Sequence, residues 1–191
     1  MELSPPHRTR EVKKSFLVFV TSKAEYEYLE WLSKALNHSL LAIRRLDSGV
    51  SDEEAIRTVA AVRRQELKKG TQYDETWCMR DARDADHLDE LIAIGAKHKV
   101  RVATTVPSFE AWLLSHFQEV DIGSGIDHAA LLVKHLPELS TAGYESKIRG
   151  RFNQADERAK SAFPITTTTP QLVQAILSSQ SKFTNQPSTR I

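Results

Sequence analysis

Four short hydrophobic runs occur in the first 105 residues, and amphipathic segments separate them. The runs cover residues 15–20 (SFLVFV), 40–43, 75–79 (ETWCM) and 99–105 (KVRVATT). Short runs rich in β-branched and aromatic residues are typical of strands buried within a sheet. After the first run, Ala24, Tyr28 and Leu32 recur every four residues, which is typical of an amphipathic helix. Strand and helix patterns that alternate in this way predict a parallel sheet flanked by helices.

Local signals predict the ends of one helix in this part of the chain. Ser51 and Glu54 form a capping-box pattern, in which a hydroxyl and a carboxylate satisfy the first free backbone N–H groups of a helix. Gly70 follows the hydrophobic stripe of the same segment and is a typical terminator. We therefore predict a helix from the capping box to about Lys69.

The C-terminal third lacks any further strand pattern after Phe117. The segment 144–162 is charged and helix-prone despite Gly150, and a last helix is predicted after Pro170, with Leu172, Val173, Ile176 and Leu177 as its hydrophobic stripe. The expected fold is α/β: a parallel sheet of about four strands sandwiched by helices, with a helical C-terminal extension.

The length of 191 residues suits one main domain. We expect a flexible N-terminal tail at 1–14, the α/β domain at 15–163, and a C-terminal helix with a disordered tail at 164–191. The net charge of +1 argues against a bulk polycation that coats DNA, although it allows a local basic groove. The single cysteine excludes an internal disulfide and a Cys-pair zinc site. With no apolar run of about 18 residues, and no signal-peptide core at the start, we expect a cytoplasmic protein that does not bind membranes.

Candidate chemistry lies where the predicted strands end, because ligands of open parallel sheets bind beyond the carboxyl ends of the strands. Lys23 and Glu25 follow the first strand, Asp81 follows the third, and Glu110 lies in the first turn of the helix after the fourth. Carboxylates gathered at one edge would suit a hard cation such as Mg²⁺ or Mn²⁺. The alternative interpretation is that Glu25 and Glu110 are ordinary helix-start charges and Asp81 a turn residue. The chain has no GxGxxG, GxxxxGK[ST] or GxSxG motif, which argues against nucleotide hydrolysis by this chain alone.

Two strings resemble a known family more specifically than these patterns do. The segment 107–117 (PSFEAWLLSHF) resembles the Pro-x-Phe-Glu-x-Trp-Leu-Leu-x-His-Phe signature of the RloB-like proteins, and 73–84 (YDETWCMRDARD) resembles their strand that ends in Asp-x-Asp. Tyr144, Lys147 and the 158–160 string (RAK) also match that family. The resemblance covers about residues 13–163.

The resemblance implies a Toprim-like fold and a magnesium-dependent nuclease active site that serves bacterial defence against phage. On that basis Glu25, Asp81 and Glu110 are the expected catalytic residues, and Asp81 with Asp84 the expected metal ligands. Nucleic acid (DNA or tRNA), an ATPase partner protein and further copies of the chain are the implied partners.

The chain departs from the family pattern at two places. Thr21-Ser22 stands where the family has Glu-Gly, and Asp81-Ala82-Arg83 stands where it has Asp-x-Asp, so that Asp84 lies one residue beyond the second aspartate position. Lys23, Arg80 and Arg83 are the expected phosphate-binding residues, because the guanidinium groups of the two arginines suit phosphate and Lys23 lies at the same sheet edge.

Two alternatives to a nuclease therefore stay open. The first is a catalytically inactive module that binds a phosphate ligand, nucleic acid or a partner ATPase. The second is an assembly subunit that docks through the hydrophobic stripe of its last helix.

Overall fold

The computed structural model describes residues 14–47, 49–82, 84–121, 123, 125–162 and 168–179. Four strands form one sheet: β1 (Phe16–Val20), β2 (Leu41–Arg45), β3 (Glu75–Asp81) and β4 (Arg101–Thr105). All three strand pairs are parallel, and the order across the sheet is β2-β1-β3-β4. The predicted α/β class and four-strand parallel sheet are confirmed.

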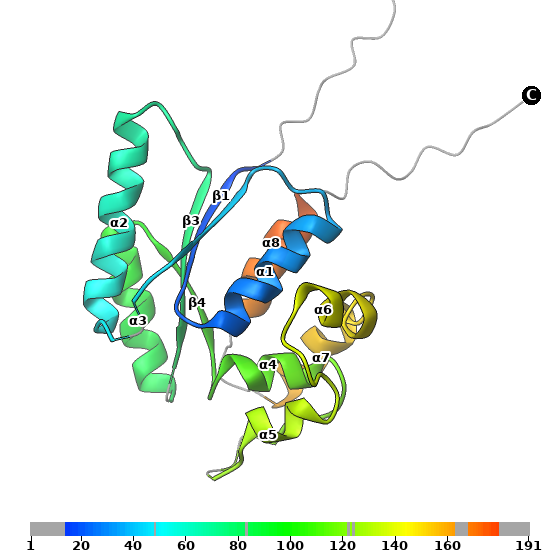
Figure 1. The fold of residues 1–191 in the computed structure, drawn as a ribbon. Coiled ribbons are helices and arrows are strands. Elements are labelled where there is room, and N and C mark those ends of the chain that lie inside the picture. Colours follow the sequence, from blue (N-terminus) through cyan, green and yellow to red (C-terminus); the bar gives the residue numbers. More distant parts are fainter. Residues whose placement is uncertain are drawn as a thin grey trace, which may run out of the picture.

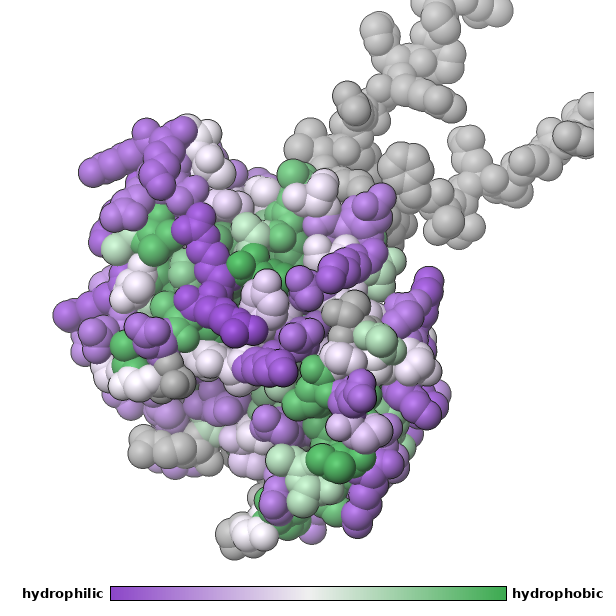
Figure 2. Space-filling view, in the orientation of Figure 1, coloured by the Kyte–Doolittle hydropathy of each residue, from purple (hydrophilic) through white to green (hydrophobic). Residues whose placement is uncertain are grey.

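Helices cover both faces of the sheet (Figure 1). On one face lie α1 (Lys23–Ala35) and α8 (Thr169–Ser178), and on the other lie α2 (Asp52–Lys68) and α3 (Ala85–His98). Four helices form a group beside the α1 layer: α4 (Phe109–Ser115), α5 (His128–Val133), α6 (Thr141–Lys147) and α7 (Phe152–Ala162). Figure 2 shows a mostly hydrophilic surface in this view, with hydrophobic residues exposed over the sheet between α1 and α2.

The core is divided by the sheet into two clusters. Phe16, Val18 and Val20 of β1 pack with α1, α4 and α8, whereas Leu17 and Phe19 pack with α2 and α3. Successive strand residues point to opposite faces, so a strand covered on both sides must be hydrophobic at every position. This requirement explains the continuous SFLVFV run.

The helix predicted from the capping box to about Lys69 is confirmed as α2, with Ser51 as its N-cap and Lys68 as its last residue. The Ser51 hydroxyl accepts a hydrogen bond from the Glu54 N–H, at 3.3 Å, and Gly70 takes a φ of +87°, which only glycine adopts without strain. The segment 144–162, predicted to be helix-prone, is helical in two pieces, because α6 ends at Lys147 and α7 begins at Phe152. Gly150, with a φ of +81°, lies in the break between them.

The last helix belongs to the core. Leu172, Val173 and Ile176 of α8 are buried, with at most 1% of each residue exposed. Thr168, the N-cap of this helix, forms hydrogen bonds with the outer edge of β4. Its N–H donates to the Thr104 carbonyl at 2.9 Å, and its hydroxyl accepts from the Thr104 N–H at 2.8 Å. The stripe is therefore occupied within the chain, which overturns the hypothesis that it docks on a partner.

The predicted tails at 1–14 and at the far C-terminus lie outside the described residues, except for Lys14. The ammonium of Lys14 lies 3.1 Å from a carboxylate oxygen of Glu75. Among the helices of the described part of the chain, none has the length and hydropathy needed to cross a bilayer.

Candidate carboxylate site

The carboxyl edge of the sheet brings together residues that are far apart in the chain. Arg45 is paired with Val20, and Asp81 with Thr105, at the ends of their strands. The alternation of β3 decides which way its last residues face. Met79 lies in the core cluster under α1 and α4, so Asp81 belongs to that face, whereas Arg80 belongs to the face of α2 and α3.

Glu25 closes the turn between β1 and α1. Its Oε2 accepts hydrogen bonds from the N–H groups of Thr21, at 2.7 Å, and Ser22, at 2.9 Å, and the Ser22 hydroxyl accepts in return from the Glu25 N–H. This is a complete capping box, and only 2% of Glu25 is exposed. Burial raises the pKa of the Glu25 carboxyl, and the hydrogen bonds oppose that rise. The first role of Glu25 is thus to hold the turn that follows β1.

Asp81 is close enough to two other carboxylates, Glu25 and Glu110, for their charges to act on it. Solvent reaches its side chain, but neighbouring protein atoms displace much of its water. This desolvation, followed by the charges of Glu25 and Glu110, raises the pKa of Asp81 from 3.8 to about 7. A hydrogen bond from the Phe109 N–H and the charge of Arg80 act in the opposite direction. Because Phe109 and Glu110 are adjacent in the first turn of α4, this bond also brings Glu110 close to Asp81.

The structure therefore brings Glu25, Asp81 and Glu110 together at one edge, as the strand-end rule predicts. We name these three residues the carboxylate site. Its negative charges are close enough to disfavour one another, which is the electrostatic condition under which a cation binds.

Arg80 and Asp84 lie on the α2 and α3 side and are already engaged. Arg80 forms an ion pair with Asp52 at the start of α2, and His87 Nε2 approaches the other oxygen of Asp52 to 2.8 Å. Asp84 is the N-cap of α3 and accepts from the His87 N–H at 2.8 Å. The metal role of Asp84 and the phosphate role of Arg80 stay predictions, and each would have to coexist with these contacts.

Of the two remaining phosphate-binding candidates, the structure describes one and not the other. Lys23 is exposed at the first position of α1, beside the carboxylate site. Arg83 lies outside the described residues. A cation that the sequence analysis did not name, Arg45, is exposed at the end of β2, and the same strand-end rule applied to the second strand would have found it.

The carboxylate site fits a hard divalent cation held by few protein ligands. Within the described ranges no group of three His, Cys, Asp or Glu side chains is arranged to hold a metal ion. Because Glu25 is 2% exposed and its Oε2 is engaged in the capping box, Asp81 and Glu110 supply the more accessible carboxylate oxygens for an ion. Mg²⁺ commonly takes only one or two carboxylates and completes its shell with water and substrate phosphate oxygens. This donor set therefore suits Mg²⁺ or Mn²⁺ better than a structural zinc ion.

A cluster of aromatic side chains supports the site from behind. The ring of Tyr28 lies 5.6 Å from Phe109 and 5.7 Å from Tyr144, and Trp112 lies 4.9 Å from His116. His116 is fully buried, and burial lowers its pKa to about 4, so it stays neutral as a core residue. The string FEAWLLSH thus places one acidic side chain, Glu110, at the edge of the sheet, while its aromatic residues anchor α4 in the core.

A family model described as "RloB-like protein" matches residues 16–191, which is nearly the whole chain. The chain belongs to the RloB-like protein family. No curated protein and no solved structure matches it significantly. Membership of the RloB-like family confirms the resemblance seen in the 107–117 string, and the residues of that string form α4 and its surroundings.

Proposed function

We propose that this RloB-like protein is a metal-dependent nuclease that hydrolyses phosphodiester bonds of DNA or RNA at the carboxylate site. The observation that supports this most directly is the convergence of Asp81, Glu110 and Glu25 at the carboxyl edge of a parallel sheet. Carboxylates whose charges act on one another are costly for a fold, and in the described residues the charge of Arg80 offsets only part of that cost at Asp81. Such an arrangement is typical of sites that bind a cation and a phosphate.

Each carboxylate has a distinct role in this proposal. Asp81 and Glu110 hold Mg²⁺ or Mn²⁺, which when bound stabilises the negative charge that develops on the phosphodiester. Glu25 is a positioning residue, because its hydrogen bonds to Thr21 and Ser22 fix the turn beside Asp81. The helix dipole of α4 and the Phe109 N–H favour the ionised form of Asp81, which is the form that binds a cation.

The surroundings of the family motif favour one alternative, a module that binds phosphate or nucleic acid without cleaving it. Asp84, the nearest substitute for the second aspartate of the motif, caps α3. In that case the site would lack a ligand, and binding would persist without metal.

The family suggests the biological setting that we propose. RloB-like proteins are associated with anti-phage defence beside an ATPase partner, and we propose the same role for this chain, in the cytoplasm. Nucleic acid, including tRNA, an ATPase and further copies of the chain are the proposed partners.

Calorimetry with Mg²⁺ and Mn²⁺ tests the proposal, with cleavage of plasmid DNA and bulk tRNA measured in parallel. Asp81→Ala and Glu110→Gln should each weaken metal binding at least tenfold and abolish metal-dependent cleavage. Asp86→Ala is the matched control, because Asp86 is an exposed aspartate in the first turn of α3. If the wild-type protein binds neither metal at millimolar concentration and cleaves neither substrate, the nuclease proposal is wrong. Metal-independent binding without cleavage would instead support the inactive module.

A further inference from the structure

Arg45 lies at the carboxyl end of β2, on the same face of the sheet as the carboxylate site. Leu41 and Ile43 of β2 pack into the cluster beneath α1, and Arg45 follows with the same alternation. Its guanidinium carbon lies 4.3 Å from the centre of the Tyr26 ring on α1. This cation–π contact holds the side chain toward α1 while the residue stays exposed.

The charge of Arg45 is not neutralised within the described part of the chain, where no carboxylate lies within ion-pair distance of it. Two other arginines of the sheet do have partners: Arg44 pairs with Glu66 at 3.1 Å, and Arg80 pairs with Asp52. A guanidinium stacked on a ring keeps its N–H groups at the edge of the plane, where they can donate to an anion. Arg45 is thus oriented by Tyr26 and still has donors available.

Lys23 is a second cation close to Tyr26. Lys23 precedes Tyr26 by three residues on α1, so the two side chains are neighbours on the helix surface. Lys23 is exposed and, in the part of the chain that is described, has no ion-pair partner. Within the described residues, two cations without an ion-pair partner therefore lie near Tyr26: Arg45 over its ring, and Lys23 one helical turn before it.

This pair of cations lies next to the carboxylate site. Arg45 is level with Val20, which leads directly into the turn that Glu25 holds. From strand spacing and register, the Cα atoms of Arg45 and Asp81 are about 12 Å apart. At about 3.4 Å of axial rise per nucleotide, that separation corresponds to roughly three to four nucleotides of one strand.

We propose that Arg45, oriented by Tyr26, and Lys23 bind a backbone phosphate of a nucleic acid a few nucleotides from the carboxylate site. Arginine binds phosphate through two parallel N–H donors, which gives direction as well as charge, and lysine adds a second positive charge. The class of ligand rests on the proposed nuclease function, whereas the phosphate-binding site itself rests on Arg45, Tyr26 and Lys23.

The test measures oligonucleotide binding without metal. Fluorescence anisotropy of a labelled 12-nucleotide single strand, in EDTA and at several salt concentrations, gives both the affinity and its salt dependence. Arg45→Ala should weaken binding about threefold to tenfold and reduce the slope of log K against log salt by about one phosphate contact. Arg45→Lys should keep the slope and lose part of the affinity. Tyr26→Leu should give an intermediate loss, because the charge remains but its orientation does not.

Arg64→Ala is the matched control, since Arg64 is an exposed arginine on α2 at the other face of the sheet. The inference is wrong if Arg45→Ala binds like the wild type, if Arg64→Ala lowers the slope equally, or if the wild type does not bind the strand. Inorganic phosphate that competes as well as the oligonucleotide would overturn the assignment to a nucleic-acid backbone. A failed nuclease proposal is distinguishable, because cleavage and metal binding would be absent while the Arg45 effect remains.

Discussion

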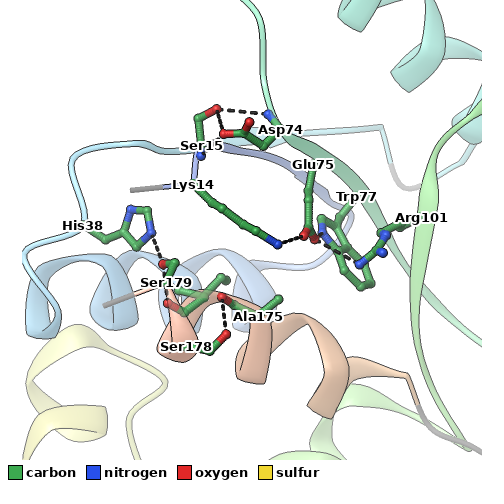
Figure 3. A network of polar contacts seen from close by, with 11 residues as sticks. Lys14, Ser15, His38, Asp74, Glu75, Trp77, Arg101, Ala175, Ser178 and Ser179 are labelled. Atoms are coloured by element: carbon green, nitrogen blue, oxygen red, sulfur yellow. Dashed lines mark hydrogen bonds and ion pairs between the residues drawn. The ribbon is translucent and has the colours of Figure 1, made fainter. Parts of the chain in front are cut away.

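The two ends of β3 each carry an acidic residue, and their surroundings are opposite in kind. Glu75, at the amino edge, receives the Lys14 ammonium at 3.1 Å, Arg101 at 3.1 Å and the Trp77 indole N–H at 3.0 Å (Figure 3). Asp81, at the carboxyl edge, has Glu25 and Glu110 as neighbours, and its pKa is raised to about 7. Neutralised charge at one end stabilises the fold, whereas clustered charge at the other end costs stability.

This difference indicates where function is to be expected. A carboxylate surrounded by donors, such as Glu75, is fully occupied by its own protein. A carboxylate whose neighbours repel it has interactions still to make, which a bound cation could supply. The contrast can be tested by substitutions at both ends of the strand.

The largest effect is expected at the amino edge. Glu75→Ala removes the acceptor of the indole N–H of Trp77, a residue that is 2% exposed. It also removes the ion pairs that Glu75 makes with Lys14 and Arg101. We expect the free energy of unfolding to fall by about 2 kcal/mol, mostly from the unsatisfied buried N–H. Urea unfolding measures this loss. Glu75→Gln should lose less, because the amide oxygen can still accept from Trp77.

At the carboxyl edge we expect the opposite sign. A carboxyl whose folded pKa is raised contributes stability that is present at low pH and is lost as pH rises from about 4 through 7. In chelator, Asp81→Asn should therefore raise Tm by about a few degrees at pH 8 and change it little near pH 4. Thermal melts across this range, compared with Asp86→Asn, measure the difference. An unchanged or lowered Tm at pH 8 would show that Asp81 is not under electrostatic stress.

A smaller effect tests the coupling between the carboxylates. Glu25→Gln removes one of the charges that raise the Asp81 pKa, so that pKa should fall below its wild-type value. Carboxyl-carbon NMR of Asp81 during a pH titration reads the change directly. Glu27→Gln is the control, because Glu27 is half-buried on the same helix and is not among the charges that raise the Asp81 pKa, so it should leave the Asp81 titration where it is.

The smallest effect is expected for the exposed partner of Glu75. The Arg101 side chain is 61% exposed, and Lys14 remains to neutralise the carboxylate. Arg101→Gln should therefore lower the free energy of unfolding by less than about 1 kcal/mol in urea unfolding. A loss as large as that of Glu75→Ala would mean that the cation, rather than the Trp77 hydrogen bond, dominates this cluster.

The sequence predicts which residues gather at the candidate site better than it predicts what each of them contacts there. The strand-end rule predicts that Glu25, Asp81 and Glu110 lie at one edge, and the charges of Glu25 and Glu110 do act on Asp81 there. The string from Ser22 to Glu25 is itself a capping-box pattern, so the structural role of Glu25 was visible locally. The pairing of Arg80 with Asp52 was not, because the two residues are 28 positions apart and meet only when α2 packs beside β3.

The sequence by itself determined the alternation of strands and helices. Hydrophobic periodicity reflects which faces of each element are buried, and it can be read from residues that are close together in the chain. Only the tertiary structure decided which charges are neutralised. The strand order β2-β1-β3-β4 and its register place Lys14 against Glu75, Asp52 against Arg80 and Glu110 near Asp81. Charge interactions depend on distance in space, and that distance is defined only when separate elements pack together.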